Sequence, residues 1–193
     1  MTLELLRAFF KEFHPTPVEN QKLIHAGVLV PLFIHDNEMY TIFTQRTDKV
    51  EHYKGQVSFP GGVYDTSDTT IIETALREAY EEIGIPPSAF EVLGVLNDYI
   101  TPTGFRITPV VAYLSTFPKF IINQIEVSEV FIAPISFFVD NKNERIEQRL
   151  RNGILMNVFF YKYRNFTIWG ATAAILHSFL HLLTEWVNSK NAL

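Results

Sequence analysis

The chain of 193 residues is 47% hydrophobic and 19% charged, a composition typical of one soluble globular domain with its own core. Its net charge of −5 argues against a nucleic-acid-binding surface, which needs a basic patch. It has no cysteine, which excludes disulfides, thiol catalysis and zinc–thiolate sites and suits a reducing cytoplasm. The sequence therefore predicts a single cytoplasmic domain over residues 1–193 that binds no nucleic acid.

Residues 1–20 predict an N-terminal helical extension. Its leucines and phenylalanines fall on one side of a helix that Thr2 is placed to cap. Charged residues interrupt the apolar run, so the segment lacks the pattern of a signal peptide. Such a helix docks on the core or packs in a homodimer, and the sequence leaves both open. Stable insertion in a membrane is not expected.

Two strands follow, over residues 26–34 and 39–44, around a turn at 35–38. Pro31 lies inside the first run. Because proline donates no backbone hydrogen bond, that point is expected at a sheet edge or a bulge.

Residues 55–85 predict a strand, a glycine loop and an amphipathic helix. The paired glycines of Phe59-Pro60-Gly61-Gly62 allow the backbone to approach a ligand closely. The helix starts near Thr69 or Thr70 and repeats apolar residues at spacings of three and four, which predicts a buried stripe. Gly84 ends it.

Glu78, Glu81 and Glu82 share one face near the end of this helix. Their i, i+3, i+4 spacing places the β-carbons about 5–6 Å apart, so their charges repel one another. They also lie at the end where the helix dipole disfavours anions. For the bare pattern a solvated acidic face is the simpler interpretation, but the glycine loop and the helix stop favour a site for a hard cation such as Mg²⁺ or Mn²⁺.

With these flanks, the stretch resembles the Nudix box of the Nudix hydrolases. Gly62 and the run from Arg77 to Ile85 match its glycine and its Arg-Glu-x-x-Glu-Glu-x-Gly core. The first glutamate of the pattern is absent; Asp68 stands nearest, with Glu73 one turn further along. The box is also one residue longer, and in this it looks like the coenzyme A pyrophosphatase branch of the family.

The resemblance, which covers about residues 25 to 185, implies a Nudix-type α/β/α sandwich with a mixed central β-sheet. It also implies that Glu78, Glu81 and Glu82 bind Mg²⁺ or Mn²⁺, together with a carbonyl of the glycine loop such as that of Gly62. Glu81 is then the candidate to accept the proton of the attacking water. Arg77 is expected to brace the carboxylates.

An upstream motif of the coenzyme A branch also resembles this sequence, with matches at Arg46, Gly55 and 59–62. Arg46 is therefore expected to bind substrate. Glu51 replaces a second arginine of that motif, a reversal of charge. Three nearby cations are candidates to replace it, with a solvated loop as the alternative: Lys49, His52 and Lys54.

After the box, residues 92–96 and 107–114 read as two strands. The loop between them ends at Phe105, which either stacks on an adenine or packs in the core. In the family a carboxylate outside the box joins the metal shell. Glu126 or Glu129 is the candidate here, and either is equally well explained as a surface acid.

The last third has a turn signal at Asn152-Gly153 between two strand-like runs and a final helix over residues 172–188. His177 and His181 have the i, i+4 spacing of metal ligands. Since no third ligand is evident, a surface or satisfied pair is the expected outcome.

The resemblance implies hydrolysis of the pyrophosphate bond of coenzyme A or an acyl derivative, giving 3′,5′-ADP and a 4′-phosphopantetheine. Two alternatives stay open. One is a Nudix pyrophosphatase that acts on another nucleoside diphosphate derivative, such as ADP-ribose or NADH. The other is a nucleotide-sensing module without catalysis, which would not need to keep Glu78, Glu81 and Glu82.

Overall fold

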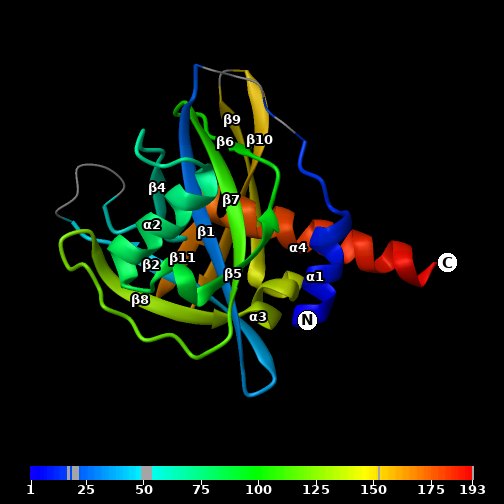
Figure 1. Ribbon diagram of the computed structural model, residues 1–193. Coiled ribbons are helices and arrows are strands. Elements are labelled where there is room, and N and C mark those ends of the chain that lie inside the picture. The colour runs from blue at the N-terminus through cyan, green and yellow to red at the C-terminus, as the bar shows by residue number, and fades with distance from the viewer. Residues whose placement is uncertain (17, 19–21, 49–53, 152, 193) are drawn as a thin grey trace.

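The computed structural model describes residues 1–193 except 17, 19–21, 49–53, 152 and 193 (Figure 1). The helices are α1 (Leu3–Glu12), α2 (Ile71–Ile83), α3 (Ile135–Val139) and α4 (Gly170–Asn191), with 3-10 turns η1 (Pro87–Ala89) and η2 (Asn141–Asn143). The strands are β1 (Ile24–His35), β2 (Glu38–Arg46), β3 (Val57–Ser58), β4 (Gly61–Val63), β5 (Phe90–Val95), β6 (Tyr99–Ile100), β7 (Phe105–Leu114), β8 (Val127–Pro134), β9 (Glu144–Arg151), β10 (Ile154–Tyr163) and β11 (Phe166–Trp169).

A mixed β-sheet forms the centre of the molecule. Its main path is β3-β2-β1-β7-β5, and β4, β6 and β8 join it at β1, β7 and β2. β1 and β7 are parallel, whereas β2, β4 and β5 pair antiparallel with their neighbours. A second, antiparallel sheet has the order β11-β10-β9. The β9–β10 hairpin turns at Gly153, as the sequence predicted, and Asn152 lies outside the described residues.

Helices cover both faces of the central sheet (Figure 1). Side chains alternate along β1, so Leu29 packs with Ala75 and Ala79 of α2, while Val30 belongs to the core shared with α1 and α4. β1 is thereby buried on both faces, which explains its nearly continuous apolar sequence. The predicted α/β/α sandwich with a mixed central sheet is confirmed.

Pro31 lies in an inner strand, so the prediction of an edge or bulge was wrong. β1 pairs with β4 up to Val28 and with β2 only from Leu32, and Pro31 falls in the gap between these two partners. The backbone N–H of Leu29 points to that side, where it donates to Pro60 at 2.8 Å. With a period of two, the Pro31 nitrogen faces the same gap, so its missing N–H removes no ladder bond there.

Small residues line the contact between α2 and β1. A Cβ at Gly27 would come within 2.7 Å of the Ile71 carbonyl oxygen. Thr70 caps the helix by accepting a hydrogen bond from the Glu73 N–H at 3.2 Å, and Gly84 ends it in the left-handed region at φ 73°. The sequence predicted both ends of this helix correctly.

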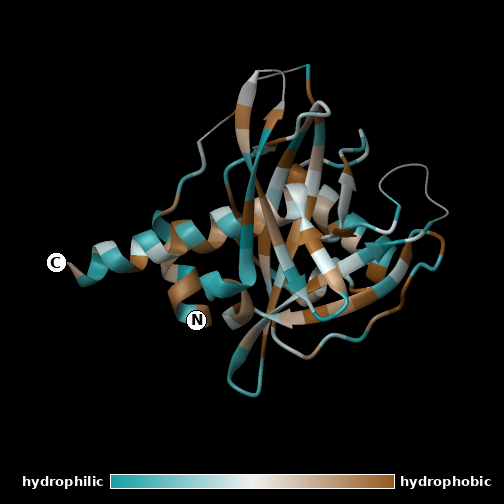
Figure 2. Cartoon of the chain, turned by 180° about the vertical axis from the view of Figure 1, so that it is seen from behind, coloured by the Kyte–Doolittle hydropathy of each residue, from teal (hydrophilic) through white to brown (hydrophobic). Residues whose placement is uncertain are grey.

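The terminal helices pack against each other. Leu6 and Phe9 of α1 are buried, and the Phe9 ring lies 5.9 Å from Trp186 of α4 with the planes at 79°. The docked alternative for α1 is therefore the one observed. α4 is longer than the predicted 172–188, because it begins at Gly170 and continues to Asn191 as a largely exposed turn at its C-terminal end (Figure 2). Nowhere in the described part of the chain is a helix long and apolar enough to cross a membrane.

Candidate active site

The glycine loop lies directly against the carboxylates of α2. A Cβ at Gly62 would come within 2.3 Å of the Glu78 carboxyl carbon, so a larger residue there would displace the Glu78 carboxylate. Glu82 is buried, with 3% of its side chain exposed, whereas Glu81 has 50% of its side chain exposed. The three glutamates thus run from the buried glycine loop out to solvent on one side of the helix.

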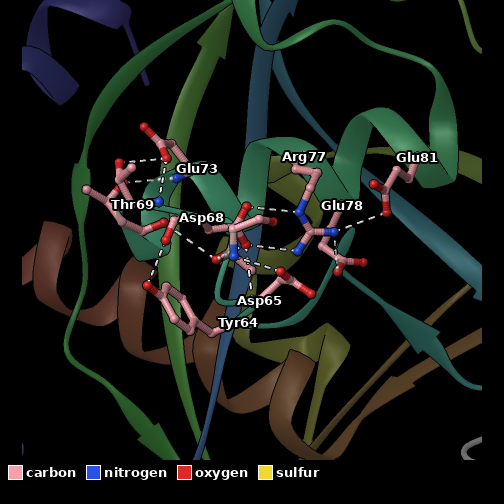
Figure 3. A network of polar contacts seen from close by, with 11 residues as sticks. Tyr64, Asp65, Asp68, Thr69, Glu73, Arg77, Glu78 and Glu81 are labelled. Atoms are coloured by element: carbon pink, nitrogen blue, oxygen red, sulfur yellow. Dashed lines mark hydrogen bonds and ion pairs between the residues drawn. The ribbon is translucent and has the colours of Figure 1, made fainter.

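Arg77 holds this arrangement together (Figure 3). Its Nε and Nη2 each donate to one oxygen of Asp68 at 3.0 Å, a bidentate pair. Its Nη1 donates to Glu78 at 2.9 Å and to Glu81 at 3.1 Å. The guanidinium therefore braces the carboxylates, as the sequence led us to expect.

Asp68, the acid that stands nearest in sequence to the missing glutamate of the box, pairs with Arg77. It is buried, accepts a hydrogen bond from Thr74 Oγ1 at 2.8 Å, and lies beside the Arg77 guanidinium, which lowers the Asp68 pKa to about 2. Glu73 is instead bound to the backbone N–H and hydroxyl of Thr69 at the start of the helix, both at 2.7 Å (Figure 3). Asp68 is thus the fourth acid of the network, and Glu73 is a capping residue.

Glu82 is a buried carboxylate with incomplete pairing. Its Oε1 lies 3.9 Å from Nη1 of Arg46, and its Oε2 has no hydrogen-bond partner among the described residues. Burial raises the pKa of Glu82 to about 8, although the charge of Arg46 and the Gly61 backbone act in the opposite direction. Burial also raises the pKa of Glu78, which Arg77 partly offsets.

Glu126 is brought to the same cluster by the turn that precedes β8. The Asn123 N–H donates to the Glu82 carbonyl at 3.0 Å, and the Thr47 N–H donates to the Glu126 carbonyl at 2.9 Å. Asn123 Nδ2 donates to Glu126 Oε1 at 3.1 Å. The negative charge of Glu126 raises the pKa of both Glu78 and Glu82, which places its carboxyl within electrostatic range of both.

Glu129, the other candidate, is exposed on β8 opposite Gln45. Between Glu126 and Glu129 the β2–β8 register shifts at Gln45/Arg46, a bulge that Ser128 fills by donating to the Gln45 carbonyl at 3.0 Å. Arg46 lies on β2 opposite this bulge, and its Nη1 is 3.9 Å from Glu82 Oε1.

The predicted substrate residues are dispersed. Arg46 lies at the carboxylate cluster with 27% of its side chain exposed, and Lys54 is exposed in the turn before β3. Phe105 is half-buried at the start of β7, opposite Ile24 of β1 and on the side of β1 away from the glycine loop. Glu51, Lys49 and His52 lie outside the described residues.

A divalent cation fits the donor chemistry of this site, although the predicted triad does not surround a single point. In the described ranges no group of three or more His, Cys, Asp or Glu side chains stands in position to hold a metal ion, so a bound cation would have to draw the carboxylates closer together. Arg77 engages Glu78 and Glu81, whereas Glu82 turns to Arg46. Three mutually repelling carboxylates, Glu78, Glu82 and Glu126, with one orphaned buried oxygen on Glu82, are nevertheless what a hard cation would satisfy.

The two histidines of α4 have separate carboxylate partners. His177 Nδ1 lies 2.7 Å from Glu144 and its ring stacks on Phe159 at 4.0 Å between centroids, while His181 pairs with Glu185 at 3.2 Å. The expectation of a satisfied pair is confirmed.

The residue that the sequence analysis missed is Asn123. Its side chain also accepts from the Ile125 N–H at 3.1 Å, an Asx turn whose signal is an asparagine at the start of a loop.

Comparison with known proteins places the chain in a family. Residues 23–160 match the model of the NUDIX domain. A Pectobacterium atrosepticum protein named uncharacterized Nudix hydrolase NudL is 40% identical over 167 residues, 83% of this chain and 82% of that protein. A protein of the same name from Escherichia coli O7:K1 is 35% identical over 178 residues, 91% of this chain and 92% of that protein.

The fold is also found in solved structures. The crystal structure of a C. elegans Ap4A hydrolase binary complex aligns with a TM-score of 0.51 at 15% identity, over 61% of this chain and 84% of that one. At this identity the likeness concerns the fold. The match to the family model and the identity to the NudL proteins show in addition that the chain belongs to the Nudix hydrolase family.

Proposed function

We propose that the protein is a divalent-metal-dependent pyrophosphohydrolase that cleaves coenzyme A or an acyl-coenzyme A to 3′,5′-ADP and the corresponding 4′-phosphopantetheine. The observation that carries the hydrolase part is the buried, half-paired Glu82 beside Glu78 and Glu126. A carboxylate in that position is costly unless a cation joins it. A buried, half-paired acid at this position therefore supports a metal-loaded diphosphate site.

Glu78, Glu82 and Glu126 would hold the metal, with the glycine loop at Gly62 closing the site against Glu78. A divalent cation bound there supplies charge neutralisation for the diphosphate and lowers the pKa of its bound water. Arg46 adds a positive charge next to Glu82 and faces the same cluster. Its role in this proposal is to balance the diphosphate charge rather than to reach a distant phosphate.

The proton of the attacking water needs an acceptor, and Glu81 is the proposed one. One of its oxygens, Oε2, accepts from Arg77 Nη1 at 3.1 Å, and half of its side chain is exposed to water. The hydrogen bond fixes the carboxylate while its other oxygen stays available to accept a proton. Arg77 acts through Glu78, Glu81 and Asp68, and is a positioning residue.

The substrate part rests on the resemblance of residues 42–62 to the upstream motif of the coenzyme A branch. Lys54 is exposed in the turn that precedes β3, and we propose that it binds an outer phosphate of the nucleotide. Phe105 is retained as a candidate to contact the adenine.

A substrate panel with Mg²⁺ and with Mn²⁺ tests the proposal. It contains coenzyme A, acetyl-coenzyme A, 3′-dephospho-coenzyme A, ADP-ribose and NADH, with phosphorus NMR or mass spectrometry of the products. Metal-dependent cleavage of coenzyme A in preference to its dephospho form supports the proposal. Preference for ADP-ribose or NADH would support the hydrolase activity but overturn the assignment of coenzyme A as the substrate. Tight binding without any cleavage would overturn the hydrolase activity and indicate a sensing module.

Two variants test the chemistry. Glu78→Gln and Glu82→Gln are each expected to abolish turnover with folding intact. Full turnover in either, at unchanged circular dichroism, would contradict the metal role. Glu129→Gln, an exposed acid on the same turn-and-strand segment as Glu126, is the matched control and should keep turnover.

A further inference from the structure

The outer part of the β9–β10 hairpin is a two-stranded ribbon at the end of the molecule away from α3 (Figure 1). β11 pairs with β10 over Phe160 to Tyr163, so nearer the turn at Gly153 no third strand joins the hairpin among the described elements. β9 forms the edge of its sheet, and its outer side pairs with no described strand. A two-stranded ribbon is only marginally stable in water, and a free strand edge is where another chain can pair.

One face of this ribbon is apolar and exposed. Ile146 is 49% exposed, Leu150 73% and Leu155 59%. Leu150 and Leu155 lie directly opposite each other, and Ile146 shares their face because side chains alternate along a strand. α4 covers the base of this face, where Phe159 stacks on His177. Single exposed apolar residues are ordinary, but three neighbours beside a free edge indicate a surface that a partner covers.

The other face of β9 carries charges that are already held in line. Glu147 pairs with Arg145 and with Arg149, whose Nη2 lies 2.8 Å from the Glu147 carboxylate. Both guanidinium groups lie over the Phe160 ring, with their Cζ atoms 4.4 and 5.4 Å from its centre. These charges are therefore ordered before a partner arrives, which lowers the entropy cost of pairing.

The sequence of β9 is complementary to itself in one antiparallel register. With Gln148 opposite Gln148 of a second copy, Glu147 faces Arg149 of that copy and Ile146 faces Leu150. Sliding one strand by two residues places either Glu147 or Arg149 opposite itself. Sliding it by one residue places Ile146 opposite Arg149, or Glu147 opposite Leu150. Because like charges directly opposite each other destabilise strand pairs, the register centred on Gln148 is favoured.

We infer that β9 pairs with β9 of a second copy of this chain, about a two-fold axis at Gln148. Each copy presents the same surface, so the contact closes on itself and stops at a dimer. The apolar row of Ile146, Leu150 and Leu155 then continues from one copy into the other. The terminal helices pack against each other within one chain, and the dimer contact lies at β9 instead.

Sedimentation velocity from 1 to 200 µM protein tests the inference. One strand and one apolar row make a small contact, and small contacts give weak, concentration-dependent association. We expect less than about a tenth of the chains in dimers at 1 µM, where unfolding is measured, and more than about half at 200 µM. A protein that stays monomeric over the whole range overturns the inference.

Charge reversal tests the register. Glu147→Arg and Arg149→Glu each place like charges opposite each other, so each variant alone is expected to stay monomeric at 200 µM. An equimolar mixture of the two variants is expected to dimerise, because each charge then faces its opposite in the other copy. The ion pairs within each chain remain altered in the mixture, so this recovery reports the contact between copies. Dimers of either single variant, or a mixture without dimers, contradict the proposed contact.

A matched control and a backbone measurement complete the test. Glu91→Arg reverses an exposed carboxylate on β5, the edge strand of the central sheet, where Arg7 binds it, and should leave dimerisation unchanged. Amide hydrogen exchange over residues 146–150 is expected to slow between 1 and 200 µM in the wild type and not in Glu147→Arg. Circular dichroism checks that each variant is folded. Dimers that form without slower exchange in β9, or that are lost in Glu91→Arg, would place the contact elsewhere and overturn the inference.

Discussion

Among the single residues of the candidate site, one buried acid is unfavourable to ionise. Glu82 is 2% exposed, its Oε1 lies 3.9 Å from Nη1 of Arg46, and its Oε2 has no hydrogen-bond partner among the described residues. Nearby Asp68 shows the opposite case, because Arg77 meets both of its oxygens at 3.0 Å. The Asp68 carboxylate is thus fully paired with a guanidinium, whereas the Glu82 carboxyl group is only partly paired.

Glu82→Gln should stabilise the metal-free protein at alkaline pH while it removes activity. Burial raises the pKa of Glu82 to about 8, above its ordinary value of 4.5. The stability that this group contributes is present below pH 4.5 and is lost as the pH rises through 8, when the buried group must ionise. Urea unfolding in EDTA should give the variant little advantage at pH 5 and a clear one at pH 9, with turnover at least about a hundredfold lower. A wild-type-to-variant difference that does not change with pH would contradict the raised pKa.

Asp68→Asn should destabilise the protein at neutral pH by roughly 2 kcal/mol, the equivalent of its pKa shift. Arg77 lowers the pKa of Asp68 from 3.8 to about 2, so the stability from this ion pair is present above pH 4 and disappears as the pH falls toward 2. Unfolding at pH 7 and pH 2.5 should show the difference from wild type shrinking at the lower pH. Asp65→Asn is the control, since Asp65 is exposed and bonds the Ser67 N–H instead.

At the scale of elements, glycines decide how closely the parts of the site approach. Gly27 brings α2 onto β1, and Gly62 brings the loop onto Glu78. Gly84 combines a left-handed φ of 73° with close packing of Ile121, so it ends the helix and positions the segment that leads to Asn123. Gly27 and Gly62 are needed because a side chain would crowd the neighbouring atoms. Gly84 is needed for that reason and also because its backbone is in the left-handed region.

Gly84→Ala should cost roughly 2–4 kcal/mol, from left-handed strain plus overpacking against Ile121. Gly153 has a similar φ of 78°, but no described residue outside its chain neighbours comes within 4 Å of an added Cβ, so Gly153→Ala should cost about 1–2 kcal/mol from strain alone. The comparison of the two thermal unfolding curves measures the packing part. Equal losses would mean that Ile121 moves away at no cost.

At the scale of the whole molecule, the two ends of the chain close one face of the sheet. α1 and α4 meet through Phe9 and Trp186, and Glu12 of α1 accepts hydrogen bonds from Trp186 Nε1 at 2.9 Å and Lys190 Nζ at 3.1 Å. Arg7 binds Glu91 through two hydrogen bonds, which ties α1 to β5. α2 and the candidate site lie on the opposite face of the central sheet. The terminal helices therefore pack on the face that does not carry the site.

Phe9→Ala should lower the free energy of unfolding by about 3–5 kcal/mol, because the ring is 2% exposed and leaves a cavity among aromatic neighbours. Leu150→Ala, at 73% exposure on β9, should change it by less than about 0.5 kcal/mol. Denaturant titration of both variants checks this. Small and equal losses would mean that α1 is only loosely docked.

The local pattern of this sequence was enough for α2, its caps, the hairpin turns and the three glutamates, because these depend on residues within a few positions of one another. The prediction of an α/β/α sandwich came from the resemblance to the Nudix hydrolases. Pro31 was misplaced because pairing of β1 changes partner at that point, and partners far apart in sequence leave no local signal. The end of α4 was set too early for a related reason, since its outer turns have few apolar residues.

Residues close together along the chain are enough to specify a glycine loop followed by a helix with acids at i, i+3 and i+4. The differences between those acids arise from the three-dimensional fold. Burial beside Arg46 leaves Glu82 with a raised pKa, Arg77 holds Glu78 and Glu81, and the turn before β8 supplies Glu126. A spacing fixes which side chains share a helix face, whereas their charge states depend on burial and on partners that the fold brings from distant segments.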